Sequence, residues 1–509
     1  MGIAFRHGAR PILSRVAVAA LALTAVVVTH AQDEEAAPAE QGAAAAPAAQ
    51  PAFGQPGLGI AGFAPPADYL SAVAGAAYTD NAFLTPEGRS STVIGTAGLL
   101  ADYGYVGNNI DALATGNLNW LHYFDHAFGD TLYGNFNGTA MWGHSTDLLQ
   151  WLFRETYTEG QADPLAAETP TYYEEVNYFT TGPYLNFNFA ALDRLSLFGL
   201  YSNTAFENSP FGSQSYEGGA SLTHALSGVS NVSLLGSSTY THYQDPRTPA
   251  EEDAVGDEEI PASSSYNMRT AEFMYNARLA RTQFAAAAGY SWEDYGNKDH
   301  YSGSPIASLQ LGRVLNAYST IYIRGMYGYQ SYGDALRGDI GGPLNAQSLG
   351  GGAPGFATAA PLKDHEITAG WNFIRARTTF TLTGGFVRQE YIEESAFNSK
   401  GETLTASLAR QLRQTVWLRL SAFGSYYEYG NLGGRTTLAT ENVSLVKQFD
   451  KVGFAVYYQR THQAYAGTQN PLGLATGAFV ENRVGIEATY DIIGHRAAGA
   501  GAIPGVPGL

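Results

Sequence analysis

The segment from His365 to Phe386 constrains the fold more than any other, because its bulky apolar residues recur at every second position. In its first half Ile367 and Trp371 share one parity, whereas Glu366 and Asn372 share the other. A soluble core helix would space its apolar residues three and four positions apart, so this period of two indicates a strand with two unlike faces. After a short polar corner the alternation resumes, and the segment therefore predicts a tight β-hairpin.

The same alternation recurs from Tyr69 almost to the end of the chain, and the connections between the alternating runs vary in length. Short joints such as Ala191-Leu192 and Arg281-Thr282 alternate with long polar segments such as residues 245–264 and 334–362. Short turns on one side and long loops on the other are typical of outer-membrane barrels, in which the turns lie in the periplasm.

Counting strands by this rule gives twenty, an even number that leaves both chain termini in the periplasm. Residues 148–157 also fit a short helix in a folded loop, so eighteen strands is the alternative. The runs reach a dozen residues or more, enough to cross a bilayer, whereas strands of a soluble sandwich or propeller usually have about 5 or 6. We therefore predict an all-β fold, a transmembrane antiparallel up-and-down β-barrel of about 18–20 strands.

Closure of the sheet explains the two faces. No water satisfies a backbone N–H or C=O in lipid, so a sheet must close on itself there, with its apolar parity toward lipid and its polar parity toward the lumen. Only 15% of the residues are charged, while Gly (59) and Tyr (33) are plentiful, which suits such a wall. A barrel of this size is too wide for side chains to fill, so a pore or a plugged pore is expected.

The chain divides into four parts. Residues 1–31 have Arg6, Arg10 and Arg15 before an apolar run and end in small residues, as a secretory signal peptide does. Residues 32–66 are rich in Ala and Pro and predict a disordered linker. Residues 67–492 form the predicted outer-membrane barrel, and residues 493–509 a flexible C-terminal tail. The expected location is the bacterial outer membrane.

Parity selects the side chains that should face the lumen. These lumen-lining candidates are Glu272, Asn276, Arg278, Gln283, Glu293, Arg324, Glu366, Asn372, Arg419, Glu481, Arg483 and Glu487. They either solvate a water-filled wall or, where Arg and Glu stand in facing strands, form a transverse field that selects solutes.

Aromatic residues near the strand ends predict interface girdles. The examples are Trp120, Tyr123, Trp142, Trp151, Tyr240, Tyr243, Tyr290, Trp292, Tyr295, Tyr426, Tyr427 and Tyr429. Alternatively, their faces could stack on sugar rings.

Composition and motifs exclude several functions. The chain has no cysteine, so disulfides, thiolate metal sites and a Cys nucleophile are excluded. The sequences G-x-S-x-G, H-E-x-x-H and the Walker loop are absent, so no enzyme activity, catalytic residue or cofactor is predicted. The acidic segment 250–262 lacks the EF-hand spacing, so no metal site is predicted. The formal charge of -18 argues against nucleic-acid binding.

Three stretches resemble a known family in their residues. These are "AYTDNAFLTPEG" (residues 77–88), "VNYFTTGPYLNFNF" (176–189) and the Tyr-rich residues 197–244. They resemble the outer-membrane β-barrel porins associated with exopolysaccharide and exosortase gene loci. The residues that carry this likeness are Asp80, Asn81, Asn177, Gly182 and Pro183. Outer-membrane barrels commonly end on an aromatic residue, whereas here a tail follows Tyr490.

The resemblance implies an outer-membrane porin-like channel, the exit for a secreted exopolysaccharide. The alternatives are a general diffusion porin for small solutes and a plugged structural or adhesive barrel without transport. Its expected partners are outer-membrane lipid, the barrel assembly machinery and periplasmic polysaccharide export proteins. The resemblance brings no catalytic residues with it.

Overall fold

The computed structural model describes residues 69–86, 88–144, 147–161, 173–207, 212–243, 265–295, 301–330, 362–391, 398–430, 434–467 and 477–494. The predicted signal peptide, the linker, the acidic segment 250–262 and all but the first two residues of the tail lie outside these residues and stay predictions. Within the described ranges no helix is long and apolar enough to cross a bilayer.

All regular structure in the described residues is β-strand. The strands are β1 (Tyr69–Thr79), β2 (Thr92–Val106), β3 (Ile110–Tyr123), β4 (Thr131–Trp142), β5 (Leu149–Gln161), β6 (Tyr173–Asn188), β7 (Asp193–Phe206), β8 (Ser213–Ser227), β9 (Ser230–Tyr243), β10 (Tyr266–Arg278), β11 (Thr282–Tyr295), β12 (Tyr301–Asn316), β13 (Ser319–Gln330), β14 (Leu362–Arg375), β15 (Thr378–Tyr391), β16 (Ser399–Arg413), β17 (Val416–Tyr429), β18 (Gly434–Gln448), β19 (Val452–Gly467) and β20 (Gly477–Ile493).

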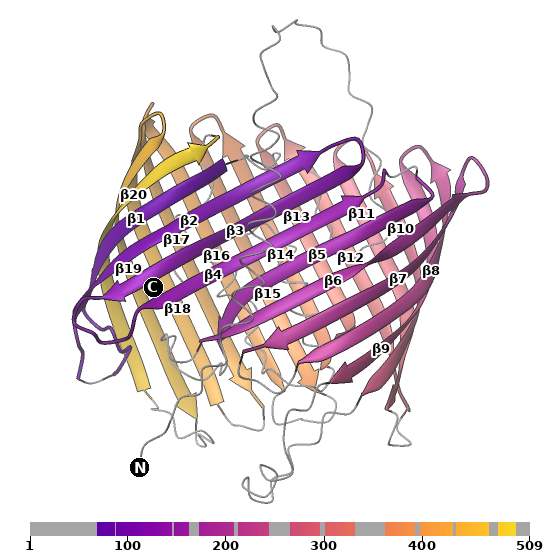
Figure 1. The fold of residues 1–509 in the computed structure, drawn as a ribbon, viewed down its shortest axis with the longest axis horizontal. Coiled ribbons are helices and arrows are strands. Elements are labelled where there is room, and N and C mark those ends of the chain that lie inside the picture. The colour runs from indigo at the N-terminus through magenta and orange to yellow at the C-terminus, as the bar shows by residue number, and fades with distance from the viewer. Residues whose placement is uncertain are drawn as a thin grey trace, which may run out of the picture. The chain divides into compact units, whose positions relative to one another are not determined.

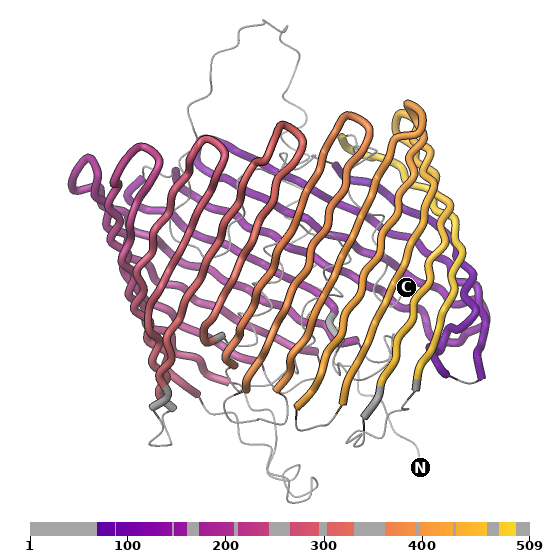
Figure 2. The backbone as a smooth tube through the Cα atoms, turned by 180° about the vertical axis from the view of Figure 1, so that it is seen from behind, coloured from indigo at the N-terminus to yellow at the C-terminus, as the bar shows by residue number. Residues whose placement is uncertain are grey.

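The strands form one closed sheet of antiparallel neighbours. Each strand pairs with the next in sequence, and β20 pairs back onto β1 from Leu70↔Ile493 to Thr79↔Arg483. Figure 1 shows β1 and β20 side by side, and Figure 2 shows the wall continuing behind, with the short turns along one rim. The predicted up-and-down barrel is confirmed. The stretch that begins at Leu149 is a strand rather than a helix, so the alternative of eighteen strands is wrong.

The hairpin of β14 and β15 has the predicted register. Phe373 pairs with Phe380, Trp371 with Leu382 and Ile367 with Phe386, around a turn at residues 376–377. Cross-strand pairs of this kind are what stabilises a sheet. The apolar parity of one strand therefore meets the apolar parity of the next.

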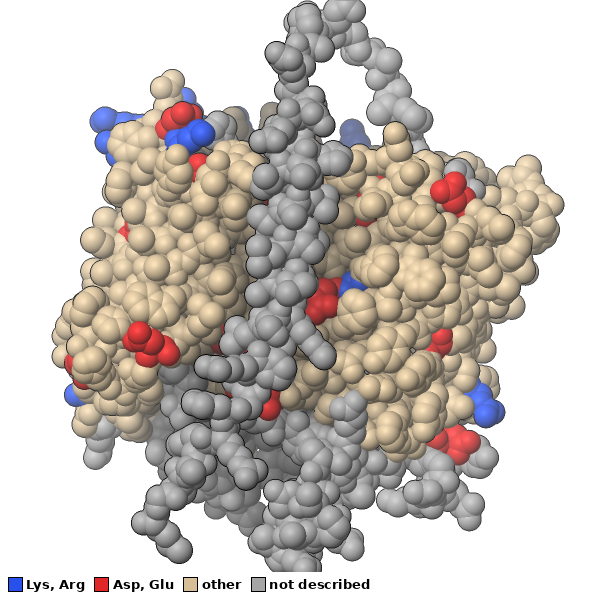
Figure 3. Space-filling model, in the orientation of Figure 1, with Lys and Arg blue, Asp and Glu red and all other residues tan. Residues whose placement is uncertain are grey.

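Exposure separates the two faces of the wall. Side chains on the convex side of a closed sheet diverge, whereas those on the concave side crowd together. The apolar parity is the exposed one, with Ile367 and Leu404 both at 55%, and polar residues of the other parity, such as Ser71 and Glu293, are fully buried. The outer face is therefore apolar and the inner face polar, and charged side chains are sparse on the face in Figure 3.

The aromatic residues divide between the faces. Trp120, Trp142, Tyr240, Trp292 and Tyr426 are exposed on the outer parity, as a girdle requires. The girdle prediction is wrong for Tyr123, Tyr243, Tyr427 and Tyr429, which have the inner parity and are buried. The side chain of Tyr295 lies outside the described residues. The alternation of side chains along each strand assigns these four tyrosines to the inner face. Their distance from the strand end, on which the girdle prediction relied, does not distinguish the two faces.

Candidate functional site

All twelve lumen-lining candidates have the parity of the inner face. The residues concerned are Glu272, Asn276, Arg278, Gln283, Glu293, Arg324, Glu366, Asn372, Arg419, Glu481, Arg483 and Glu487, and only Arg278, at a strand end, is exposed. Whether they line a path for solute stays a prediction.

The pairing brings few of the opposite charges among them together. Arg324 lies directly across from Gln310 and Thr368, so neither neighbouring strand places a carboxylate directly opposite it. Glu366 instead accepts a hydrogen bond of 2.8 Å from the Thr368 hydroxyl. The register of neighbouring strands does not test a transverse field between facing strands, which stays a prediction.

A buried charged pair lies beside the seam between β1 and β20. The Arg483 guanidinium contacts Glu481 Oε1 at 2.5 Å, and the Thr79 hydroxyl donates to the same oxygen at 2.5 Å. Further along the seam the Ser71 hydroxyl donates to Asp491 Oδ1 at 2.7 Å. All five side chains are buried. The first and last strands, β1 and β20, are therefore joined on the inner face by polar side chains as well as by backbone hydrogen bonds.

Sequence reasoning missed several buried carboxylates of the inner face, among them Asp364 and Asp491. Asp364 shares the parity of Glu366, and Asp491 shares that of Glu487, and both are at most 5% exposed. Applying the parity rule to every polar residue of these strands would have found them. Their partners could not be found in this way, because Ser71 is far from Asp491 in sequence.

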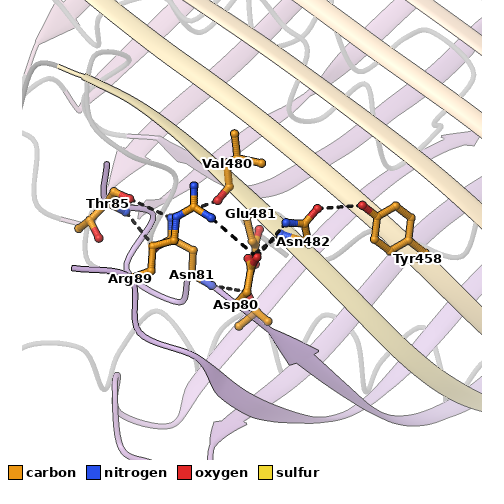
Figure 4. A network of polar contacts seen from close by, with 9 residues as sticks. Asp80, Asn81, Thr85, Arg89, Tyr458, Val480, Glu481 and Asn482 are labelled. Carbon is orange, nitrogen blue, oxygen red and sulfur yellow. Dashed lines mark hydrogen bonds and ion pairs between the residues drawn. The ribbon is translucent and has the colours of Figure 1, made fainter. Parts of the chain in front are cut away.

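Asp80 joins the same seam on its outer side, at the rim where β1 ends (Figure 4). Its carboxylate accepts hydrogen bonds from the backbone N–H of Asn482 at 2.7 Å and from the Asn482 side-chain amide at 2.8 Å. Asn482 in turn accepts a hydrogen bond from the Tyr458 hydroxyl at 2.8 Å. Arg89 lies 4.0 Å from Asp80. This series of hydrogen bonds therefore links the end of β1 to β20 and β19.

Asn81 occupies the inner side of the same rim and is fully buried. Its amide nitrogen donates to the carbonyl of Thr85 at 2.9 Å and to that of Val480 at 3.3 Å, and its oxygen accepts from the Thr85 N–H at 3.1 Å. These bonds hold a loop in which Leu84 has a positive φ of 52°, an uncommon conformation for a bulky residue. We call Asp80 and Asn81 together the seam clasp.

The other residues of the resemblance lie on β6. Asn177 donates to Glu155 Oε1 at 2.6 Å on the outer face. Gly182 and Pro183 mark a gap in the β6–β7 ladder, which has partners at Thr181↔Tyr201 and again at Tyr184↔Phe198. Proline has no N–H to donate to a neighbouring strand, which explains the gap.

One part of the inner face departs from the polar rule. Ile94, Leu121, Tyr123 and Tyr133 form a buried apolar cluster, against which Phe128 packs. The ring of Phe128 also lies 5.2 Å from that of Phe83. The loops at residues 80–91 and 124–130 thus have an apolar core beneath them, and alternation alone did not predict it.

Inner side chains of β6 to β9 form a series of hydroxyl pairs, which we call the hydroxyl wall. Thr180 and Ser202 lie 3.0 Å apart, and Ser202 also accepts from the Tyr178 hydroxyl at 3.2 Å. The wall continues with Ser215 and Thr241 at 3.0 Å, and with Thr223 and Ser233 at 2.8 Å. These groups are neutral and can each donate and accept.

Fold and faces together define the class of protein. A closed sheet with an apolar outer face and a polar inner face satisfies every constraint that a bilayer places on strands, and bacterial barrels of this kind lie in the outer membrane. The chain is an outer-membrane β-barrel. In the part of the chain that the structure describes, no three His, Cys, Asp or Glu residues are grouped so that they could hold a metal ion.

Comparison with known proteins returned fold relatives alone. No family model and no curated protein matches the chain. Solved structures that match include the siderophore receptor PirA from Acinetobacter baumannii, with 9% identity, a TM-score of 0.44 and coverage of 84% of this chain and 81% of that one. PirA from Pseudomonas aeruginosa has 13% identity, a TM-score of 0.37 and coverage of 84% and 81%.

The FrpB iron transporter from Neisseria meningitidis has 9% identity, a TM-score of 0.37 and coverage of 83% and 81%. At these identities, and with TM-scores below 0.5, the likeness to these three proteins carries nothing about ligand or transport to this chain.

Proposed function

We propose that this protein is an outer-membrane channel that serves as the exit for a secreted exopolysaccharide. The hydroxyl wall on β6 to β9 carries the proposal. A sugar chain presents many hydroxyl groups, and the partly exposed Ser202 and Ser215 of the wall can exchange hydrogen bonds with them as the sugar advances. Because each such bond contributes only about 0.5–1.5 kcal/mol net, the contacts are weak enough to be released and remade during passage. The resemblance to porins of exopolysaccharide loci favours the same cargo.

A conductance experiment tests the hydroxyl wall. The purified chain in a planar bilayer is expected to give a steady open current, which soluble fragments of the exopolysaccharide interrupt. Replacing Ser202 and Ser215 by Ala removes two hydroxyls from the wall and should shorten the interruptions by about threefold to tenfold, the effect of losing one or two such bonds. Dwell times at a fixed fragment concentration measure this.

Ser238→Ala is the matched control, because Ser238 has the outer parity and is exposed. It should leave the dwell times unchanged. A steady current that the fragments never interrupt would favour a general diffusion porin instead. An intact barrel that passes no current would favour the plugged structural alternative.

A deletion strain tests the cargo directly. Loss of the gene is expected to abolish surface polysaccharide, while periplasmic polysaccharide accumulates, because its exit is closed. Wild-type surface polysaccharide together with slowed uptake of small solutes would contradict the proposal. Co-purification from cross-linked cells would identify the periplasmic export proteins and the assembly machinery that the proposal includes as partners.

A further inference from the structure

A row of basic side chains crosses the outer face of the wall from β14 to β18, on the side of the long connections. His365 pairs with Arg388, Arg388 with Lys400, Lys400 with Glu428 and Glu428 with Arg435. All have the outer parity, and Arg388 and Lys400 are 56% and 54% exposed. We call the basic members, His365, Arg388, Lys400 and Arg435, the basic row. Figure 2 turns these strands, drawn in orange, toward the viewer.

Apolar side chains lie next to the basic row on the same face. Two residues further along the strands toward the short turns are Ile367, Phe386 and Tyr426, which are 55%, 40% and 37% exposed. On β16, Leu404 is the second outer-face residue after Lys400, and it is 55% exposed. Cations therefore stand at the edge of an apolar band rather than within it.

The carboxylates near the row leave its charge available. Arg388 contacts Glu390 at 2.5 Å and Lys400 contacts Glu428 at 2.9 Å, but both pairs are exposed. Exposed ion pairs contribute little, so a stronger anion can join or replace their carboxylates. Arg435, across from Glu428, is exposed and has no ion pair within the described part of the chain. Among the described residues, Glu402 adds a further carboxylate in the neighbouring apolar row.

The basic row is distinctive in a chain with 46 acidic and 28 basic residues. The outer parity of β5 and β6 carries Glu155, Glu159 and Glu175 and no Lys or Arg. The row thus marks one sector of the barrel, and it does not follow from the composition of the chain.

We propose that the basic row binds the phosphate groups of an anionic glycolipid in the outer leaflet, with its acyl chains on the neighbouring apolar side chains. Guanidinium groups bind phosphate with two parallel hydrogen bonds, and an ammonium adds a point charge. Only an amphipathic molecule satisfies both the cations and the apolar band, which separates a lipid from free phosphate. This inference holds whether or not the channel exports polysaccharide.

Lipid retention tests the inference on the full-length barrel in detergent. Native mass spectrometry with added lipopolysaccharide should show bound lipid on the wild type. The triple variant Arg388→Gln, Lys400→Gln and Arg435→Gln should retain at least about tenfold less lipopolysaccharide than the wild type, because charge-assisted hydrogen bonds are lost. Dephosphorylated lipopolysaccharide should bind both proteins equally weakly. Because the three side chains are exposed, the variant should keep the heat-modifiable mobility of the folded barrel.

The matched control changes charge on the inner face. Arg324→Gln with Arg419→Gln should retain as much lipopolysaccharide as the wild type. Equal retention by the triple variant and the wild type would overturn the inference. So would equal binding of phosphatidylglycerol, or full displacement of the lipid by millimolar inorganic phosphate, because the site would then recognise any anion.

Discussion

Gly182→Ala is expected to destabilise the barrel strongly and to lower the yield of folded protein. A Cβ atom at Gly182 would lie 2.9 Å from Cα of Leu200 and would overlap the carbonyl oxygen of Gly199. Both obstacles belong to the backbone of β7, so β6 and β7 would have to separate. Overpacking of this kind costs about 1–3 kcal/mol and sometimes more. The midpoint of urea unfolding in detergent, followed by tryptophan fluorescence, measures the loss.

Gly199→Ala on the facing strand is the matched control. Nothing lies within 4 Å of a Cβ built on Gly199, so this variant should unfold within about 0.5 kcal/mol of the wild type, as surface substitutions usually do. Equal midpoints for the two variants would show that the close approach of β6 and β7 at Gly182 does not matter to stability.

Asn81→Ala is expected to loosen the barrel at its seam. The change removes three hydrogen bonds of a fully buried side chain and leaves the Thr85 N–H and the carbonyls of Thr85 and Val480 without these partners. A buried polar group left unsatisfied costs about 1–3 kcal/mol, so a loss of roughly 2–4 kcal/mol is expected. One lost bond joins the end of β1 to Val480 of β20, and the other two hold the loop that follows β1, so hydrogen exchange should rise first in these two strands.

Arg89→Ala provides the comparison within the same loop. Its guanidinium lies 4.0 Å from Asp80 and is 47% exposed, and pairs of this kind contribute about 0–1 kcal/mol. The Arg89 variant should therefore exchange like the wild type at β1 and β20. If Asn81→Ala had no larger effect than Arg89→Ala, the seam clasp would not be holding the barrel closed.

The residues of the family resemblance acquire a physical meaning from these two positions. Asn81 and Gly182 come from separate stretches of the sequence, and neither carries chemistry that acts on a substrate. Asn81 holds the closing strands β1 and β20 together. Gly182 permits the close approach of β6 and β7. These two matched residues therefore serve the construction of the barrel and do not themselves bind the cargo.

The sequence by itself determined the strands, their faces and the closed barrel. Successive side chains of a strand point to opposite faces, which is a local property of the backbone. The adjacent residues Glu366 and Ile367 can therefore be assigned to opposite faces without knowing which strands lie beside them. The need to satisfy every backbone group in lipid then requires closure. The stretch beginning at Leu149, for which a short helix was the alternative, also follows the alternation, with Trp151 and Phe153 on the outer parity.

Only the tertiary structure decided which residues meet. Asp80 and Asn482 are joined because the two end strands close in one particular register, and no local pattern encodes a contact across the length of the chain. The inner apolar cluster around Leu121 likewise depends on loops that fold onto the wall. The basic row arises in the same way, since Arg388, Lys400 and Arg435 become neighbours only when three separate hairpins align side by side.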